Sequence, residues 1–156
     1  MSNSRLIKFR AWDEEAEYMY YSDKCWENDE AKFLCESDGT LKCYVPETIE
    51  ATRDEPEHIV GREIGSIMQF TGFKDRNKTD IYGGDIAKLS YGIPPTYDIV
   101  IIEYADEEYI GDIPISCWWM RNVRPNGCSA SLCKTYENDL EIIGNIIQDK
   151  ELLNDS

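Results

Sequence analysis

The segment from Thr71 to Leu89 contains residue types that bind phosphate in other proteins. A P-loop has the pattern G-x-x-x-x-G-K-[ST] before a helix, because backbone N–H groups and a lysine contact the phosphate oxygens. Gly83 and Gly84 are not followed by a lysine, and Asp85 would repel a phosphate. Ile86–Leu89 is typical of an extended strand rather than a helix. We therefore interpret the two glycines as a sharp corner between strands.

The same segment also contains part of a calcium-binding pattern. A calcium loop needs D-x-[DN]-x-[DN]-G and a later glutamate, which together supply the oxygen ligands. Asp75 and Asn77 match the first two ligands, but Thr79 stands third and no glycine follows at the sixth position. We therefore predict a tight turn at Asp75–Lys78, because asparagine tolerates the left-handed backbone that such turns need.

The sequence contains no arrangement that is typical of catalysis. Nucleophilic hydrolysis needs a serine or cysteine with a histidine base, but the single histidine, His58, lies in an acidic segment without such a motif. The tightest acidic cluster, between Tyr104 and Tyr109, is explained equally well as a solvated turn. We therefore expect no catalytic residues and no cofactor. The alternative is a small metal-dependent hydrolase or nucleic-acid-processing enzyme that uses acidic residues.

The six cysteines predict reduced thiols rather than a metal centre. A structural zinc site usually shows a C-x(2–4)-C pair, and only Cys128 and Cys133 approach that spacing. A zinc site built from these two, Cys117 and one N-terminal cysteine is a third hypothesis. We rank it behind a non-enzymatic binding protein and behind the metal-dependent enzyme. The other cysteines stand far apart, at positions Cys25, Cys35 and Cys43.

The charge of the chain constrains its partners. Asp and Glu total 31 against 16 Lys and Arg, so the net charge is -15 at pH 7. Phosphate backbones and anionic lipids would repel such a chain, so we expect no direct nucleic-acid partner and no membrane. A basic protein is the expected partner. An acidic surface that serves only solubility is the simpler alternative, and a mimic of DNA the rarer one.

The N-terminal sequence and the hydropathy pattern indicate a cytoplasmic protein. No apolar run is long enough to span a membrane, and the first residues show no signal-peptide pattern.

Two adjacent tryptophans provide the candidate contact surface. Trp118 and Trp119 lie in a strand-like segment, where neighbouring side chains point to opposite faces. One of them is expected in the core, and the other faces solvent, a partner subunit or a ligand. We therefore predict partner binding by Trp118, Trp119 and Arg121, against the alternative that neighbouring loops cover both indoles.

The N-terminal part of the sequence predicts short strands. Alternating apolar residues indicate two strands between Ile7 and Tyr21, and Asp38-Gly39 indicates a hairpin that places Cys35 and Cys43 on paired strands. The acidic segment Pro46–His58 predicts one or two helical turns or a loop, and the boundary between two lobes.

The C-terminal part predicts a compact sheet. Ile99–Tyr104 is typical of a buried central strand, residues 105–115 of a turn or edge segment, and residues 116–123 of a further strand. The last strand carries a bulge at Gly144-Asn145 and precedes a short helical tail. The predicted fold is mainly β: a small barrel-like C-terminal core of antiparallel strands, an N-terminal β-hairpin lobe and few short helices. The predicted domains are residues 1–60 and 61–156, or one continuous domain.

Three sequence blocks resemble the YopX family of phage- and prophage-encoded proteins. They read IKFRAWDEEAEYMYY, IMQFTGFKDRNKTDIYGGDIAKL and DLEIIGNIIQDKELL, and they stand in the family's order over nearly the whole chain. Lys78 and Gly83 depart from the family pattern, which often has glycine and glutamate there. We assign a structural role in turns to the residues that carry the motif: Thr71, Gly72, Asp75, Asn77, Tyr82, Gly84 and Asp85.

The resemblance implies a compact barrel-like β fold, a homo-oligomer and a bacterial host cell. It implies no biochemical role and therefore no catalytic residues. Together with the charge, it leads us to expect a non-enzymatic, acidic protein-binding or accessory module in the cytoplasm of a bacterial host.

Overall fold

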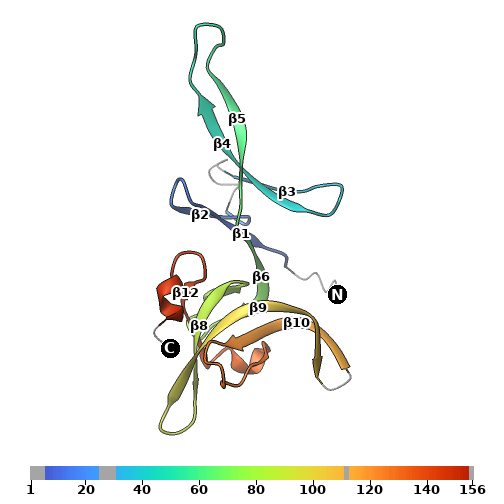
Figure 1. Ribbon diagram of the computed structural model, residues 1–156, viewed down its shortest axis with the longest axis vertical. Coiled ribbons are helices and arrows are strands. Elements are labelled where there is room, and N and C mark those ends of the chain that lie inside the picture. The colour runs from blue at the N-terminus through green and yellow to red at the C-terminus, as the bar shows by residue number, and fades with distance from the viewer. Residues whose placement is uncertain (1–5, 25–30, 111–112, 155–156) are drawn as a thin grey trace. The chain divides into compact units, whose positions relative to one another are not determined.

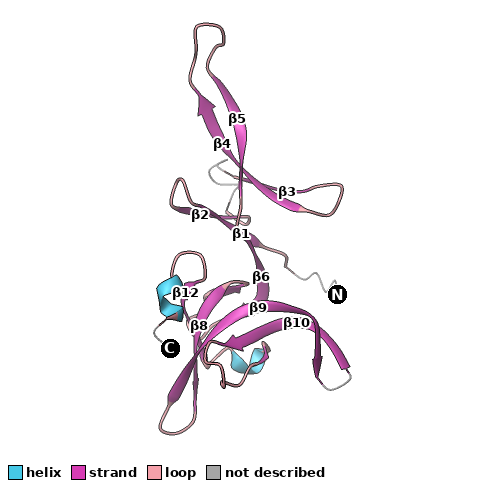
Figure 2. Cartoon of the chain, viewed as in Figure 1, coloured by secondary structure: helices cyan, strands magenta, loops and turns pink. Residues whose placement is uncertain are grey.

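The computed structural model describes residues 6–24, 31–110 and 113–154 of the chain. Strands account for 54% and helices for 5%, so the predicted mainly β class is confirmed (Figures 1 and 2). In the described part, no helix is long and apolar enough to cross a membrane. The elements in chain order are β1 Phe9–Asp13, β2 Tyr18–Tyr21, β3 Lys32–Cys35, β4 Leu41–Ile49, β5 His58–Ile64, β6 Ile67–Lys74, β7 Asp80–Tyr82, β8 Asp85–Tyr91, β9 Thr96–Ile110, β10 Ile113–Asn122, β11 Ala130–Ser131, η1 Lys134–Tyr136, β12 Leu140–Asn145 and η2 Lys150–Leu153.

The chain folds into two compact units. The N-terminal unit is Lys8–Gln69, and the C-terminal unit is Phe70–Ser156 together with Met1–Ile7. Strand β6 crosses the division, so its first half pairs with β1 and its second half with β7. The contacts therefore divide the chain after Gln69, whereas the domain limit drawn from the sequence, after residue 60, stays a prediction.

The N-terminal unit contains the hairpins that its turn residues predict. Strands β1 and β2 form an antiparallel hairpin. Strands β3 and β4 pair around Asp38-Gly39, where Gly39 has a positive φ of 87°. Cys43 lies opposite Phe33 on the paired strand. A small core of buried residues holds the unit together: Ala11, Ala31, Cys43, Val45 and Ile64.

The loop predicted for Pro46–His58 is present only at residues 50–57, and the ends of the segment are strand. Pro46 lies inside β4 and His58 begins β5, and these two strands pair from Cys43↔Ile64 to Ile49↔His58. The physical reason is that β-branched residues on both strands favour extended backbone and outweigh the acidic composition. Pro46 lies beyond the end of the β3 pairing, on a part of β4 that pairs with β5 alone among the described strands, and such edge positions tolerate proline.

The C-terminal unit contains a curled half-barrel sheet with the order β11-β10-β9-β8-β12. Its central strand is β9, as predicted, and Val100, Ile101 and Ile102 in it are all buried. The bulge predicted near Gly144 is present as a register shift between β12 and β8. The side chains that form the main core are Ile81, Ala87, Val100, Ile102, Trp118, Met120, Leu132 and Leu140.

Residues 105–115, predicted as a turn or edge segment, are mostly strand. Strand β9 runs to Ile110, β10 begins at Ile113, and the two remain paired there, with Ile115 opposite Glu108. Isoleucines at three of these positions favour extended backbone despite the acidic neighbours. The two residues between the strands lie outside the described residues.

The motif segment after β6 forms the two turns that its composition predicts. Asp75 Oδ1 accepts hydrogen bonds from the backbone N–H groups of Asn77 (2.8 Å) and Thr79 (2.9 Å). Its Oδ2 accepts a third, from Ile142 N–H on β12 (3.0 Å). Lys78 has a positive φ of 66°, the left-handed region that favours the glycine often found there in the family. One buried carboxylate thus holds the turn and joins it to a distant strand.

The second turn, at Gly83-Gly84, joins β7 to β8. Asp85 Oδ2 accepts a hydrogen bond from Tyr82 N–H at 2.7 Å, and Gly84 has a positive φ of 89°. The Gly84 backbone bonds to Ile102 O (2.7 Å) and to Ile146 N–H (2.9 Å). The glycine corner is therefore bonded to β9 and to the residue that follows β12. These bonds and the positive φ of Gly84 explain the glycines there as structural residues.

Candidate functional site

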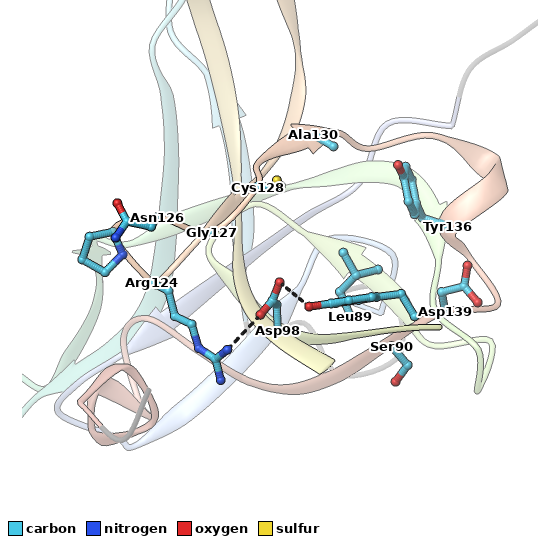
Figure 3. Close-up of a pocket in the computed structure, with 12 residues that line it drawn as sticks. Leu89, Ser90, Asp98, Arg124, Asn126, Gly127, Cys128, Ala130, Tyr136 and Asp139 are labelled. Atoms are coloured by element: carbon cyan, nitrogen blue, oxygen red, sulfur yellow. Dashed lines mark hydrogen bonds and ion pairs between the residues drawn. The ribbon is translucent and has the colours of Figure 1, made fainter. Parts of the chain in front are cut away.

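The C-terminal unit contains a cavity of about 810 Å³ on one side of its sheet (Figure 3). It lies between the β8–β9 hairpin, the loop after β10 and the η1 segment. Its lining residues are Leu89, Ser90, Tyr91, Asp98, Arg124, Pro125, Asn126, Gly127, Cys128, Ala130, Tyr136 and Asp139.

Asp98 is the polar centre of this cavity. Arg124 Nη1 lies 3.4 Å from Asp98 Oδ1, and the Tyr91 hydroxyl donates to Asp98 Oδ2 at 3.2 Å. The Asp98 side chain is only 14% exposed, whereas that of Arg124 is 56% exposed. In Figure 3, Arg124 lies on one side of Asp98, and Tyr136 and Asp139 lie on the other. Asp98 is thus paired with an arginine that is more exposed than itself.

The wall next to Arg124 is a tight loop held by Asn122. The buried Asn122 side chain accepts a hydrogen bond from Arg124 N–H (2.9 Å) and donates to Cys128 O (3.4 Å). A Cβ on Gly127 would lie 2.0 Å from Asn122 Cγ, so the loop has room only for glycine there. Gly127 N–H bonds to Arg124 O at 2.9 Å, which closes a turn over residues 124–127 and positions Arg124.

The opposite wall carries a second carboxylate. Asp139 N–H bonds to Tyr136 O, and Asp139 O accepts a bond from Ser90 N–H, each at 2.9 Å. These backbone bonds attach the η1 segment to the end of β8. The cavity thus presents two carboxylates, one guanidinium and two tyrosines around apolar surface from Leu89 and Ala130. This combination suits a ligand with an apolar stem and a cationic head.

The structure separates the predicted contact residues Trp118 and Trp119. Trp118 is 8% exposed, belongs to the main core and packs edge-on against Tyr104, with ring centroids 5.4 Å apart. Trp119 is half-buried, and Arg121 Nε donates to Glu103 Oε1 at 2.9 Å. Trp119 and Arg121 are the accessible members of the set, and their role in binding stays a prediction.

The residues around the cavity were not predicted as a site from the sequence. The available signals were the Asn126-Gly127 turn and the tyrosines that flank the 92–96 loop, and neither specifies a ligand. Cys128 lines the cavity, but within the described residues no three His, Cys, Asp or Glu side chains are placed to hold a metal ion. Cys35, Cys117, Cys128 and Cys133 carry free thiols, and Cys25 lies outside the described residues.

The N-terminal unit has a smaller hollow of about 320 Å³ that contains an ion-pair cluster. Arg62 Nη2 donates to Asp13 Oδ2 at 2.7 Å, and further carboxylates of Glu15 (3.4 Å) and Glu47 (3.8 Å) surround the guanidinium. The hydrogen bond from Arg62 holds the pKa of Asp13 below its ordinary value of 3.8, although burial opposes this. Backbone N–H groups of Ala16 and Glu15 act in the same direction as Arg62.

The buried Asp13 is expected to make stability depend on pH in acid. Because its pKa is lowered in the folded chain, its contribution is complete above the unfolded value and disappears as pH falls through the lower folded value. Replacing Asp13 by asparagine should cost about 1–3 kcal/mol at pH 6, and the difference from wild type should shrink below pH 3.8. Urea unfolding of both proteins from pH 6 to pH 2.5 measures this. A difference that is constant with pH would contradict it.

Comparison with known proteins identifies the family and the fold. The family model described as "YopX protein" matches residues 8–154. A solved structure, "Crystal structure of protein EF1440 from Enterococcus faecalis", is similar with a TM-score of 0.54 and 24% sequence identity. The similarity covers 96% of this chain and 99% of that one. No curated protein matches the sequence.

Proposed function

Because the chain belongs to the YopX protein family, we propose that it is a phage- or prophage-encoded binding module that acts without catalysis. Its partner is a basic segment of a host or phage protein, and it works in the cytoplasm of a bacterial host. The cavity of the C-terminal unit is the site that takes this segment.

The observation that supports this proposal is the composition of the cavity walls. A lysine or arginine side chain combines an apolar stem with a cationic head. Leu89 and Ala130 provide apolar surface for the stem, and the tyrosine rings accept a cation over their faces. The exposed carboxylate of Asp139 and the inner carboxylate of Asp98 then provide hydrogen-bond acceptors for the head.

The charge of the whole chain favours the same class of partner. A net charge of -15 attracts basic proteins over long distances and accelerates their association. Because salt screens such attraction, association is expected to slow as ionic strength rises. The long-range field brings the partner to the surface, and the cavity selects among basic segments.

We also propose that the chain forms a homo-oligomer through the β9–β10 surface around Trp119. The half-buried indole lies beside the Arg121–Glu103 ion pair, whose side chains are 49% and 41% exposed. An indole with an arginine and a carboxylate beside it is typical of contacts between subunits. Two acidic copies repel each other, and burial of the Trp119 indole at the centre of the contact would offset this repulsion.

Binding of a cationic peptide tests the proposed function. The probe is a fluorescein-labelled peptide, acetyl-Gly-Arg-Gly-Arg-Gly-amide, followed by anisotropy at fixed ionic strength. The double variant Asp98→Asn with Asp139→Asn is expected to weaken binding by about tenfold, because it removes two charged acceptors. The matched control, Glu36→Gln with Glu141→Gln, has the same net charge and should change affinity less than about twofold.

Equal weakening in both double variants would contradict the proposal, because binding would then follow net charge alone. Turnover of a nucleic acid or ester substrate that depends on Mg²⁺ or Mn²⁺ would contradict the non-catalytic part of it.

A further inference from the structure

Among the residues that the structure describes, no third strand pairs with the outer half of the β4–β5 hairpin. Strand β3 pairs with β4 only as far as Tyr44, and beyond this point the described strands pair only with each other, from Pro46↔Gly61 to Ile49↔His58. This outer half, residues 46–61, is referred to below as the distal hairpin (Figure 1). An isolated two-stranded hairpin is only marginally stable in water, so a further strand would stabilise it.

The two edges of the distal hairpin differ in how well they are protected. On the β4 edge, Pro46 removes a backbone donor, which discourages another strand from pairing there. The β5 edge, His58–Gly61, contains neither proline nor lysine. In the described part of the chain, β5 is the last strand of its sheet. The β5 edge is therefore the side on which a strand can be added.

The distal hairpin also exposes apolar side chains on both of its faces. Ile59, which is 71% exposed, lies opposite Thr48 on one face. Val60 and Ile49, which are 36% and 37% exposed, lie on the other face, because side chains alternate along a strand. An exposed, apolar edge strand without protecting charge is a template for pairing with another chain.

The charge of the distal hairpin indicates which chain pairs with it. Arg53 is the only Lys or Arg between Pro46 and Gly61, and a second copy of this acidic hairpin would be repelled at the same edge. The acidic residues of the same segment are Glu47, Glu50, Asp54, Glu55 and Glu57. The complementary partner is therefore an extended segment in which lysine or arginine alternates with β-branched residues.

We propose that the β5 edge of the distal hairpin binds such a basic, extended segment of another protein by adding it as a further strand. Main-chain hydrogen bonds to residues 58–61 provide the affinity, as in other cases of strand addition. Contacts of β-branched residues with Ile59 and Val60, and of cations with the acidic residues, select the sequence. This site lies in the N-terminal unit and uses none of the cavity residues.

Three peptides of equal charge distinguish strand addition from general attraction. The probe is acetyl-Lys-Val-Arg-Val-Lys-Val-Arg-amide. The two controls have the same sequence and carry N-methyl groups on alternate backbone amides, one control on the odd-numbered residues and the other on the even-numbered residues. N-methylation leaves charge and side chains unchanged but prevents one edge of the peptide from donating hydrogen bonds. On the wild-type chain, at least one methylated register is expected to bind about tenfold more weakly or not at all. Equal affinity for all three peptides would overturn the proposal.

Protein variants locate the binding site on the same edge. The double variant Ile59→Asn with Val60→Asn is expected to weaken peptide binding by about tenfold, whereas Ile49→Asn on β4 should change it less than about threefold. Backbone amides of residues 58–61 should exchange more slowly with solvent when the peptide is bound. Unchanged exchange at saturation would overturn the proposal, even if a variant failed to fold. The Asp98→Asn with Asp139→Asn variant should bind this peptide normally, which separates this site from the cavity.

Discussion

Replacing Asp75 by alanine is expected to lower the free energy of unfolding of the C-terminal unit by about 3–5 kcal/mol. The Asp75 side chain is 1% exposed and accepts hydrogen bonds from three backbone N–H groups. Alanine leaves these donors without their acceptor in a buried place, and each unsatisfied donor costs about 1–3 kcal/mol. Urea unfolding followed by near-ultraviolet circular dichroism measures the loss.

Two further substitutions separate the hydrogen bonds of Asp75 from its charge. Asp75→Asn keeps one carbonyl acceptor and should lose less stability than Asp75→Ala. Asp80→Asn, which removes an exposed ion pair with Lys74 in the same segment, should cost less than about 1 kcal/mol. A loss below about 1 kcal/mol for Asp75→Ala would show that water replaces the carboxylate and that the motif has another role.

The two adjacent tryptophans are expected to respond in opposite ways to replacement by alanine. Trp118→Ala should cost about 3–5 kcal/mol of unfolding free energy, because it removes a large side chain from the main core. Trp119→Ala should cost less than about 1.5 kcal/mol, because its half-buried indole leaves a smaller void. Thermal unfolding of both variants at one protein concentration measures the difference.

The same pair of variants tests the proposed homo-oligomer. In sedimentation velocity, Trp119→Ala is expected to shift the protein towards the monomer, because it removes the apolar centre of the proposed contact. Arg121→Gln should weaken self-association less, since an exposed ion pair contributes little. An unchanged sedimentation profile for Trp119→Ala would place the contact between subunits elsewhere or exclude it.

The turn residues of the family motif are not part of the candidate sites. Thr71, Asp75 and Asp85 are buried, and their side-chain oxygens hydrogen-bond to backbone groups of neighbouring elements. Leu89 and Asp139, which line the cavity, lie at the ends of the sequence blocks that resemble the family, whereas the distal hairpin lies outside these blocks. The turn residues therefore account for the fold, and the proposed contacts with partners depend on other residues.

The sequence by itself determined the class of the fold and its local turns. Asp38-Gly39, Asp75–Lys78 and Gly83-Gly84 were recognisable because each turn depends on a few adjacent residues with special backbone preferences. The buried strand at Ile99–Tyr104 was recognisable because a continuous run of β-branched residues is a local signal. The net charge also follows from composition alone, and the proposal of a basic partner starts from it.

Only the tertiary structure decided which distant residues meet. The strand at Pro46–Ile49 and the length of the pairing in residues 105–115 were missed because acidic composition resembles that of loops, while pairing with the neighbouring strand keeps these residues extended. Asp98 and Arg124 belong to separate segments, and a register in the β9–β10 ladder brings them together. Ile142 N–H reaches Asp75 across 67 positions of the chain. Such contacts depend on strand order and register, which local preferences leave undetermined.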